Sequence, residues 1–295
     1  MAFVTWRGGR NVVIRDGEAG PEFDAVSWPL ALSTDGRVVA YQARQGEDQF
    51  CVVGGRKSRA YRSVGLPVLS ADGSVVAFAA SNEDGWRVVR NCKEGERYDW
   101  VGNLTLHPTG RRLAYTAERR EAGKLKAFVV VDGAPDPTFD RVIPPIFSED
   151  GSTIAYGGLS NGEWAVIVGR EETPVRGELT RVFLSSSGDK VAYVIDEGSH
   201  RRMVSPEGTG PEFDSIGEAV FLKDGRVAYL AARGTRVVLV VGQHLLPLDQ
   251  GEFSGLRESA DASHLGFAVR QDRLMTWKVV PIPRPGEHIT KETKP

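Results

Sequence analysis

Aspartate recurs in two repeated sequence contexts, and carboxylates could serve in general acid–base catalysis or as metal ligands. The first context is an Asp-Gly pair. The second is a Phe-Asp or Tyr-Asp pair, which ends the segments "PEFD" at 21–24, "ERYD" at 96–99, "PTFD" at 137–140 and "PEFD" at 211–214. Near-equivalent positions cannot all belong to one active site, so we interpret these carboxylates as turn residues that accept backbone N–H groups. A ring of acidic groups at the mouth of a channel is the functional alternative.

Other residue types with catalytic potential form no recognised motif. The sequence has no G-x-S-x-G nucleophile elbow, no H-E-x-x-H or C-x-x-C metal spacing and no phosphate-binding glycine loop. The five histidines are scattered over separate segments: His107, His200, His244, His264 and His288. We therefore predict a protein that is not an enzyme, with no catalytic residue, no bound metal and no cofactor. A composite site built from several loops would leave no linear signature.

The Asp-Gly pairs belong to a repeat that runs through the chain. The copies "STDGRVVAY" at 33–41, "SADGSVVAF" at 70–78 and "SEDGSTIAY" at 148–156 are three of seven. The third residues of successive copies are 37, 37, 41, 37, 37 and 37 positions apart. A register this regular indicates a repeat array, in which each unit packs on its neighbours.

Each repeat reads as four short strands. The Asp-Gly turn joins two apolar runs, a Val-rich third run follows, and a weaker fourth segment ends at the aromatic-Asp pair. We therefore predict an all-β fold, a seven-bladed β-propeller of four-stranded antiparallel blades in one domain, 1–281. The repeats start near residues 27, 65, 102, 143, 180, 217 and 254. Residues 2–24 would complete the last blade and close the ring, and residues 282–295 would form a flexible tail.

The repeated phrase S-x-D-G-x-x-V/I-A-Y/F, followed by a Val-rich strand, resembles the WD-like repeat of TolB-type β-propellers over essentially the whole chain. TolB itself carries a signal peptide and an amino-terminal α/β domain, and related propellers accompany prolyl-oligopeptidase-like hydrolases. The sequence shows neither companion domain. The resemblance thus implies a bacterial-type, stand-alone propeller and does not identify its partner.

Composition narrows the classes of partner. The chain has 295 residues, 37 Lys plus Arg and 39 Asp plus Glu, for a formal net charge of −2. This balance does not favour a nucleic-acid partner, and no segment is apolar for long enough to insert in a membrane. Two cysteines, Cys51 and Cys92, are too few for a disulfide framework. We expect a cytoplasmic protein with a protein or peptide partner, and its oligomeric state stays open.

Candidate partner-binding residues lie in the loops that should surround one opening of a propeller, because binding residues concentrate in loops on rigid scaffolds. Aromatic and charged side chains suit a protein interface. The loops between repeats supply Asp24, Trp28, Trp100, Asp140, Arg181, Asp214 and Glu218. The one repeat that is four residues longer adds a basic loop in "AERREAGKLKA" at 117–127, with Arg119, Arg120 and Lys124.

The favoured function is a non-catalytic protein–protein interaction scaffold that uses this loop face. Two alternatives remain. One is a hydrolase or lactonase with a composite site in the channel. The other is a TolB-like component associated with the cell envelope.

Overall fold

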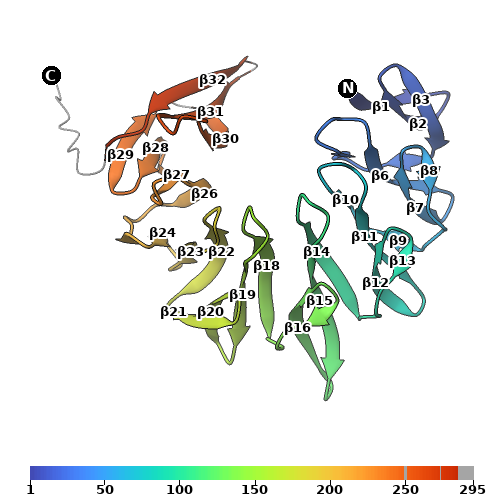
Figure 1. Cartoon of the computed structure of the whole chain (residues 1–295), viewed down its shortest axis with the longest axis horizontal. Coiled ribbons are helices and arrows are strands. Elements are labelled where there is room, and N and C mark those ends of the chain that lie inside the picture. The colour runs from blue at the N-terminus through green and yellow to red at the C-terminus, as the bar shows by residue number, and fades with distance from the viewer. Residues whose placement is uncertain (249–250, 273, 285–295) are drawn as a thin grey trace. The chain divides into compact units, whose positions relative to one another are not determined.

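The computed structural model describes residues 1–248, 251–272 and 274–284, and these residues form strands and turns without a helix. The expected tail, 282–295, lies outside the described residues from position 285 onward. The described strands form eight antiparallel sheets in chain order (Figure 1). The chain divides into two compact units, residues 1–145 with 158–161 and residues 146–157 with 162–295.

The amino-terminal half of the chain contains four sheets. The first has β1 (Ala2–Arg7), β2 (Arg10–Arg15) and β3 (Glu18–Phe23). The second has β4 (Ala25–Val26), β5 (Ala31–Leu32), β6 (Val39–Gln45), β7 (Asp48–Val53) and β8 (Arg56–Lys57). The third has β9 (Ser63–Val64), β10 (Val68–Leu69), β11 (Val76–Asn82), β12 (Gly85–Arg90) and β13 (Lys93–Glu94). The fourth has β14 (Trp100–Leu106), β15 (Leu113–Glu121), β16 (Lys124–Val131) and β17 (Ala134–Pro135).

The carboxyl-terminal half contains the other four. The fifth sheet has β18 (Arg141–Phe147), β19 (Ile154–Ser160), β20 (Glu163–Val168) and β21 (Glu171–Val175). The sixth has β22 (Glu178–Leu184), β23 (Val191–Asp196), β24 (Arg201–Ser205) and β25 (Gly208–Thr209). The seventh has β26 (Ser215–Phe221), β27 (Val227–Arg233), β28 (Arg236–Val241) and β29 (His244–Leu248). The eighth has β30 (Glu252–Glu258), β31 (His264–Gln271) and β32 (Leu274–Pro281).

Within a sheet, consecutive strands are hydrogen-bonded neighbours, as in β14-β15-β16-β17 and β26-β27-β28-β29. In the second and third sheets the first strand is interrupted, so that β4 and β5 both pair with β6, and β9 and β10 both pair with β11. Antiparallel four-stranded sheets repeated along a chain are the blades of a β-propeller. The predicted all-β class and blade-type sheets are therefore confirmed.

The number of blades and the closure of the ring are not confirmed. Strands β1, β2 and β3 pair with one another in a three-stranded sheet, and β30, β31 and β32 form another. The seven-bladed closed ring, with the last blade completed by residues 2–24, stays a prediction.

In the sheets between the two terminal ones, the second strand is buried on both faces, as its small and aromatic residues predict. Ala114 in β15 is fully buried, and Tyr115 beside it is 5% exposed. The cores form between successive sheets within each unit. One cluster joins Ala77 and Val88 of the third sheet to Tyr115 and Phe128 of the fourth. Such a second strand thus buries both faces and alternates small residues with large ones.

A pair of aromatic rings connects successive sheets. The ring that precedes the loop to the next sheet packs edge to face on the ring in the second strand of that next sheet. Four pairs have centroids 6.1–6.2 Å apart: Phe23–Tyr41, Tyr61–Phe78, Tyr98–Tyr115 and Phe213–Tyr229. Such pairs contribute about 0.5–1.5 kcal/mol each beyond the area that they bury. The aromatic residues of three Phe-Asp or Tyr-Asp pairs, Phe23, Tyr98 and Phe213, therefore hold two sheets together.

The Asp-Gly turns are built by a serine and an aspartate. Ser70 donates its hydroxyl to Asp72 Oδ1 at 2.6 Å, and that carboxylate also accepts the Ser74 N–H at 3.0 Å. Ser148, Asp150 and Ser152 repeat the arrangement. These hydrogen bonds lower the pKa of Asp72 and of Asp150 to about 2, first through the serine hydroxyl. These carboxylates are therefore engaged in hydrogen bonds within their own turns.

Successive Asp-Gly turns also contact one another. Ala71 donates its N–H to Pro108 O at 2.7 Å, and Thr34 donates to Ala71 O at 2.8 Å. Gly73 adopts a φ of +71°, and a Cβ at this position would lie 2.6 Å from Val38 Cγ2 of the preceding turn. Only glycine combines this backbone conformation with so close an approach.

We expect Gly73→Ala to destabilise the fold by about 1–3 kcal/mol more than Gly36→Ala, because only the first substitution places a methyl group against a neighbouring turn. Gly36 is a matched control, with a φ of +69° and no atom within 4 Å of the point that a Cβ would occupy. Denaturant unfolding of both variants measures the difference. Equal losses would show that Val38 moves away without penalty.

The turn aspartates should also make stability depend on pH. Their pKa values are lower in the folded chain than the ordinary value of about 4, so their contribution is complete above pH 4 and is lost as pH falls toward 2. We expect the melting temperature of the double variant Asp72→Asn/Asp150→Asn to fall less between pH 5 and pH 2 than that of the wild type. Parallel curves would contradict this account of the turns.

Candidate functional site

The carboxylates of the Phe-Asp pairs act between sheets. Asp24 Oδ2 accepts the N–H of Gly46 at 2.6 Å, and Asp214 Oδ2 accepts that of Gly234 at 2.6 Å. Asp140 Oδ2 accepts the Asn161 N–H at 3.0 Å. Each acceptor follows one sheet, and each donor is the first residue of the β-turn between the second and third strands of the next. The interpretation of these aspartates as turn residues is confirmed, and their role in binding a partner stays a prediction.

Two further candidates, Arg181 and Glu218, also connect neighbouring sheets. Arg181 donates its guanidinium to Ile216 O, and burial is the main cause of its lowered pKa. Glu218 Oε2 accepts the Leu256 N–H at 2.8 Å. Both residues belong to first strands with an irregular register, β22 and β26. The side chains of Arg181 and Glu218 thus connect neighbouring sheets, so fewer of their polar atoms are available to bind a partner.

The predicted basic loop at 117–127 is a long hairpin. The strands β15 and β16 have nine and eight residues, and eight residue pairs join them from Ala114↔Val131 to Glu121↔Lys124. The turn has only two residues, Ala122 and Gly123, both with positive φ. Such a turn matches the twist of the strands that it joins. The four extra residues therefore lengthen two strands and leave the turn tight.

The aspartate between sheets shows how far this hairpin extends. Asp99 Oδ2 accepts the N–H of Arg120 at 2.7 Å, whereas Asp24, Asp140 and Asp214 reach the first turn residue of their hairpins. Arg120 still lies within β15, one residue before its end. The tip from Glu121 to Lys124 thus continues beyond the level at which the other hairpins turn.

A groove of about 640 Å³ lies beside this hairpin. The β11–β12 turn lines it with Glu83 and Asp84, and the segment before β14 lines it with Glu96, Arg97, Tyr98 and Asp99. Arg119 lines it from β15. We call these residues the hairpin groove. Four carboxylates and two guanidinium groups line the groove, and Arg62, 2.6 Å from Glu83, and Arg87, 2.5 Å from Asp84, offset part of the negative charge.

Ion pairs fix several of these side chains. Asp84 pairs with Arg87 at 2.5 Å and with Arg97 at 3.3 Å, and hydrogen bonding to Arg87 is the main influence that lowers the pKa of Asp84. Arg119 lies 3.5 Å from Glu96, and its guanidinium carbon is 5.2 Å from the centre of the Tyr98 ring. The groove is therefore a preorganised surface of charged groups on an aromatic base.

Apolar side chains border the groove and the hairpin. Trp100 is 38% exposed and lies over Gly102, where a Cβ would collide with the indole. Its strand position is opposite Glu118, next to Arg119. Leu125, two residues beyond the turn, is 48% exposed. Trp and Arg, which lie side by side here, are enriched in binding hot spots.

The structure thus places four of the predicted residues in one sheet, and a fifth, Asp140, joins them through an ion pair of 2.5 Å with Lys126 of β16. Trp100, Arg119, Arg120 and Lys124 all belong to the β14–β15–β16 part of the fourth sheet. Trp28 is 71% exposed and lies between β4 and β5 of the second sheet. Glu83, Asp84 and Glu96 line the groove although the sequence did not single them out as binding residues. The repeat offered a signal for Glu96, because it places the segment between two sheets beside the hairpin of the following sheet.

The described residues contain no group of three or more His, Cys, Asp and Glu side chains arranged to hold a metal ion. Within the same residues, no helix is long and apolar enough to cross a membrane. Cys51 is buried and Cys92 is exposed, and both are unpaired thiols.

Comparisons with solved structures find matches at low identity. A prolyl endopeptidase structure is 13% identical, with a TM-score of 0.48 over 88% of this chain and 48% of that one. The β-propeller domain of the Trilobed protease from Pyrococcus furiosus is 12% identical, with a TM-score of 0.47 over 88% and 95% of the two chains. An oligogalacturonate lyase in complex with manganese is 12% identical, with a TM-score of 0.46 over 96% of each chain.

The chain spans about half the length of the prolyl endopeptidase that it matches. No protein-family model matches the sequence, and no curated protein is similar to it. The resemblance to TolB-type propellers stays a prediction.

Proposed function

We propose that the chain is a non-catalytic scaffold that binds a segment of a protein partner at the hairpin groove and the adjoining β15–β16 hairpin. The observation that carries this proposal is the extension of one hairpin beyond its counterparts, directly beside an open groove. A tight two-residue turn and a regular register make the extension a rigid surface. Arg119 contributes both to the groove wall and to β15, so the two features form one surface.

The charges specify the kind of segment that fits. Glu83, Asp84, Glu96 and Asp99 outnumber the two arginines of the groove, so basic side chains of the partner complement it. Arg120 and Lys124 near the tip favour acidic side chains. Trp100 and Leu125 offer apolar contacts between these regions. The proposed partner segment therefore carries basic residues, an apolar anchor and acidic residues.

The proposal includes a cytoplasmic location, which two unpaired cysteines favour. It includes no cofactor, no nucleic acid and no insertion into a membrane. The formal net charge of −2 supports a partner other than a polyanion.

Charge reversal at the tip tests the scaffold function. The partner is first captured by cross-linking from the native host and identified by mass spectrometry, and its affinity is then measured with purified proteins. We expect Arg120→Glu/Lys124→Glu to weaken binding by about tenfold or more, because two attractive contacts become repulsive. The salt dependence of binding should fall with it.

Lys93→Glu/Arg111→Glu is the matched control, since it alters the net charge by the same amount at exposed positions outside the hairpin groove. Its affinity should equal that of the wild type. If tip and control variants bind equally well, the partner docks elsewhere.

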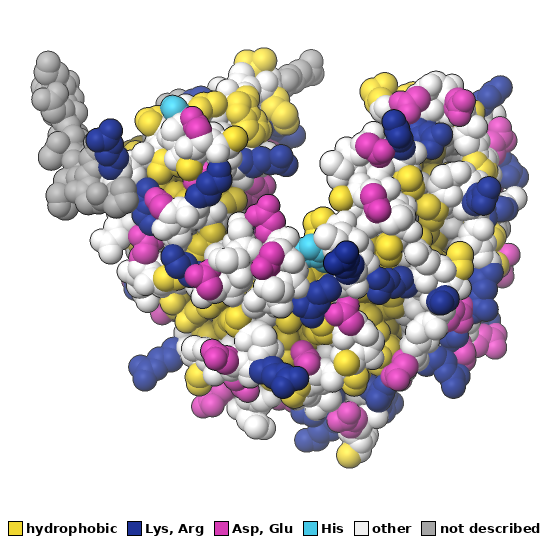
Figure 2. All heavy atoms as spheres, viewed as in Figure 1, with side chains coloured by type: hydrophobic (Ala, Val, Ile, Leu, Met, Phe, Trp, Pro, Cys, Tyr) yellow, Lys and Arg dark blue, Asp and Glu magenta, His cyan; other side chains and the backbone are white. Residues whose placement is uncertain are grey.

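We also propose that the terminal strands close a seven-bladed ring, as the sequence predicts. The two terminal sheets supply different parts of one repeat. The sheet β1–β3 ends on the fourth-strand motif "PEFD", and the sheet β30–β32 begins with a first strand. Strands β1 and β32 are edges of their sheets and expose large apolar side chains, including Trp6 and Trp277. Figure 2 shows hydrophobic side chains gathered over the region of β32. Exposed apolar edges favour further pairing.

Hydrogen exchange tests this closure. If the terminal strands combine, the amides of β32 that do not pair with β31 should be protected in the whole chain. Deletion of residues 1–7 should then release them, whereas the amides of β12 should keep their protection. Identical exchange of β32 in both chains would rule out closure through β1.

A further inference from the structure

The second unit contains a pocket that the hairpin groove does not include. Its volume is about 390 Å³, and it lies between the outer strands β24 and β25 of the sixth sheet and the strands β27 and β28–β29 of the seventh. Ser205, Glu207 and Thr209 line one side, and Tyr229 and Gln243 line the other. The volume is in the range of small-molecule sites.

Tyr229 lines this pocket, and its hydroxyl lies directly beneath Gly210 of the pocket wall. The side chain is 2% exposed, and its hydroxyl is fully buried without a hydrogen-bond partner among the described residues. Phe213 packs edge to face on its ring at 6.2 Å and fixes the ring in place. A Cβ at Gly210 would lie 2.7 Å from the hydroxyl oxygen, so glycine leaves room for it. A buried hydroxyl without a partner destabilises a fold, which indicates that another group is expected to satisfy it.

The other polar groups restrict the chemistry of that group. Burial raises the pKa of Tyr229 to about 12, so the hydroxyl keeps its proton and can donate it to an acceptor. Glu207 accepts the Val227 N–H through Oε2 at 3.4 Å, and its negative charge lies near the tyrosine. The pocket has no Lys or Arg among the described residues that line it.

These groups disfavour charged ligands. An anion would accept a hydrogen bond from Tyr229 but would meet Glu207, and no cation among the lining residues would compensate the repulsion. An ammonium group would pair with Glu207 but offers no acceptor for the tyrosine. A hydroxyl both donates and accepts, and adjacent hydroxyls on a sugar or polyol can serve both residues at once. The side chains of Ser205, Thr209 and Gln243 can likewise both donate and accept hydrogen bonds.

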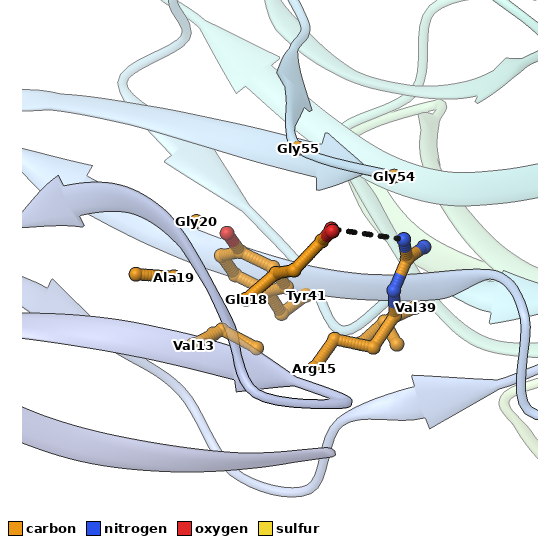
Figure 3. A pocket seen from close by; sticks show the side chains of 9 residues that line it. All are labelled: Val13, Arg15, Glu18, Ala19, Gly20, Val39, Tyr41, Gly54 and Gly55. Carbon is orange, nitrogen blue, oxygen red and sulfur yellow. Dashed lines mark ion pairs between the residues drawn. The ribbon is translucent and has the colours of Figure 1, made fainter. Parts of the chain in front are cut away.

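A second pocket in the first unit occupies the equivalent position of its repeat. The segment "GPEF" occurs at 20–23 beside it and at 210–213 beside the larger one. Its volume is about 150 Å³ (Figure 3). Arg15 lines it, lies 4.0 Å from Glu18 and donates to Arg37 O at 2.7 Å. Ser205 stands at the position corresponding to Arg15, so the larger pocket lacks that long cationic side chain.

We propose that the pocket between the sixth and seventh sheets binds a neutral, polyhydroxylated ligand of the size of a monosaccharide, either free or as the terminal sugar of a glycan. Tyr229 donates a hydrogen bond to one ligand hydroxyl, and Glu207 accepts a hydrogen bond from a neighbouring hydroxyl. Gly208 and Gly210 also line the pocket, and because they have no side chains they leave space for the ligand beside Tyr229 and Glu207. This site is independent of the hairpin groove, because every residue that lines it belongs to the other unit.

Binding measurements on the full chain test the proposal. The probes are D-glucose, D-galactose, D-mannose, N-acetyl-D-glucosamine and myo-inositol, with acetate and methylammonium as charged comparisons. Calorimetry should show saturable binding of at least one neutral probe. Tyr229→Phe should weaken that binding by about tenfold, the effect of one hydrogen bond. Ser205→Arg should abolish it by filling the pocket.

Tyr41→Phe is the matched control, since Tyr41 lines the smaller pocket at the equivalent position. Its binding should equal that of the wild type. A glycan array then distinguishes the two sources, because a free-sugar site binds the soluble probe only and a glycan site also binds the immobilised sugar. Thermal unfolding shows whether each variant is folded. If Tyr229→Phe does not fold, the test rests on Ser205→Arg alone.

Three results would overturn the proposal. The first is that no neutral probe binds, and the second is that only acetate or methylammonium binds. The third is that a folded Tyr229→Phe or Ser205→Arg variant binds the sugar as tightly as the wild type. None of these results bears on the partner affinity of the tip variants, so the two proposals fail separately.

Discussion

The contact between one sheet and the next is the constraint on which the structure depends. No single four-stranded sheet can bury both of its faces, so each second strand needs a neighbour on either side. The edge-to-face ring pairs, such as Tyr98–Tyr115 and Phe213–Tyr229, set the spacing of that contact. Once the spacing is fixed, the aspartate after the first ring lies within reach of the next hairpin turn. Packing and turn geometry are thus specified by the same two consecutive residues.

This coupling explains why both proposed sites are departures from the repeat. A residue that every repeat uses for packing cannot be changed for binding without loss of the contact between sheets. The β15–β16 hairpin avoids the conflict, because its extra residues lie beyond the Asp99–Arg120 hydrogen bond and leave that bond intact. The larger pocket avoids it differently. Ser205 replaces a long side chain at a position that lines a space and holds no ring pair.

Sequence periodicity was sufficient for the class of fold and for the roles of the repeated residues. The Asp-Gly turns, the buried Ala-Tyr pairs and the aromatic-Asp pairs are local features, and each is specified by a few neighbouring residues. The long hairpin could be located but was predicted as a loop, because a four-residue insertion does not reveal whether it lengthens strands or a turn. The groove and the pocket could not be predicted, since Glu83 and Tyr98, or Glu207 and Tyr229, are distant in sequence and meet only through packing.

The repeat also supplies an internal standard against which an unusual residue can be judged. Tyr98 and Tyr61 have rings equivalent to that of Phe213, and the Tyr61 hydroxyl donates to Glu94 at 2.8 Å. A buried tyrosine in this fold can therefore obtain an acceptor from the chain itself. Tyr229 has none within the described part of the chain, although Glu207 lies nearby and its Oε2 is engaged with a backbone N–H. In a molecule whose repeated polar groups are so regularly satisfied, an unsatisfied hydroxyl on a residue that lines a 390 Å³ pocket favours an external ligand over a defect of packing.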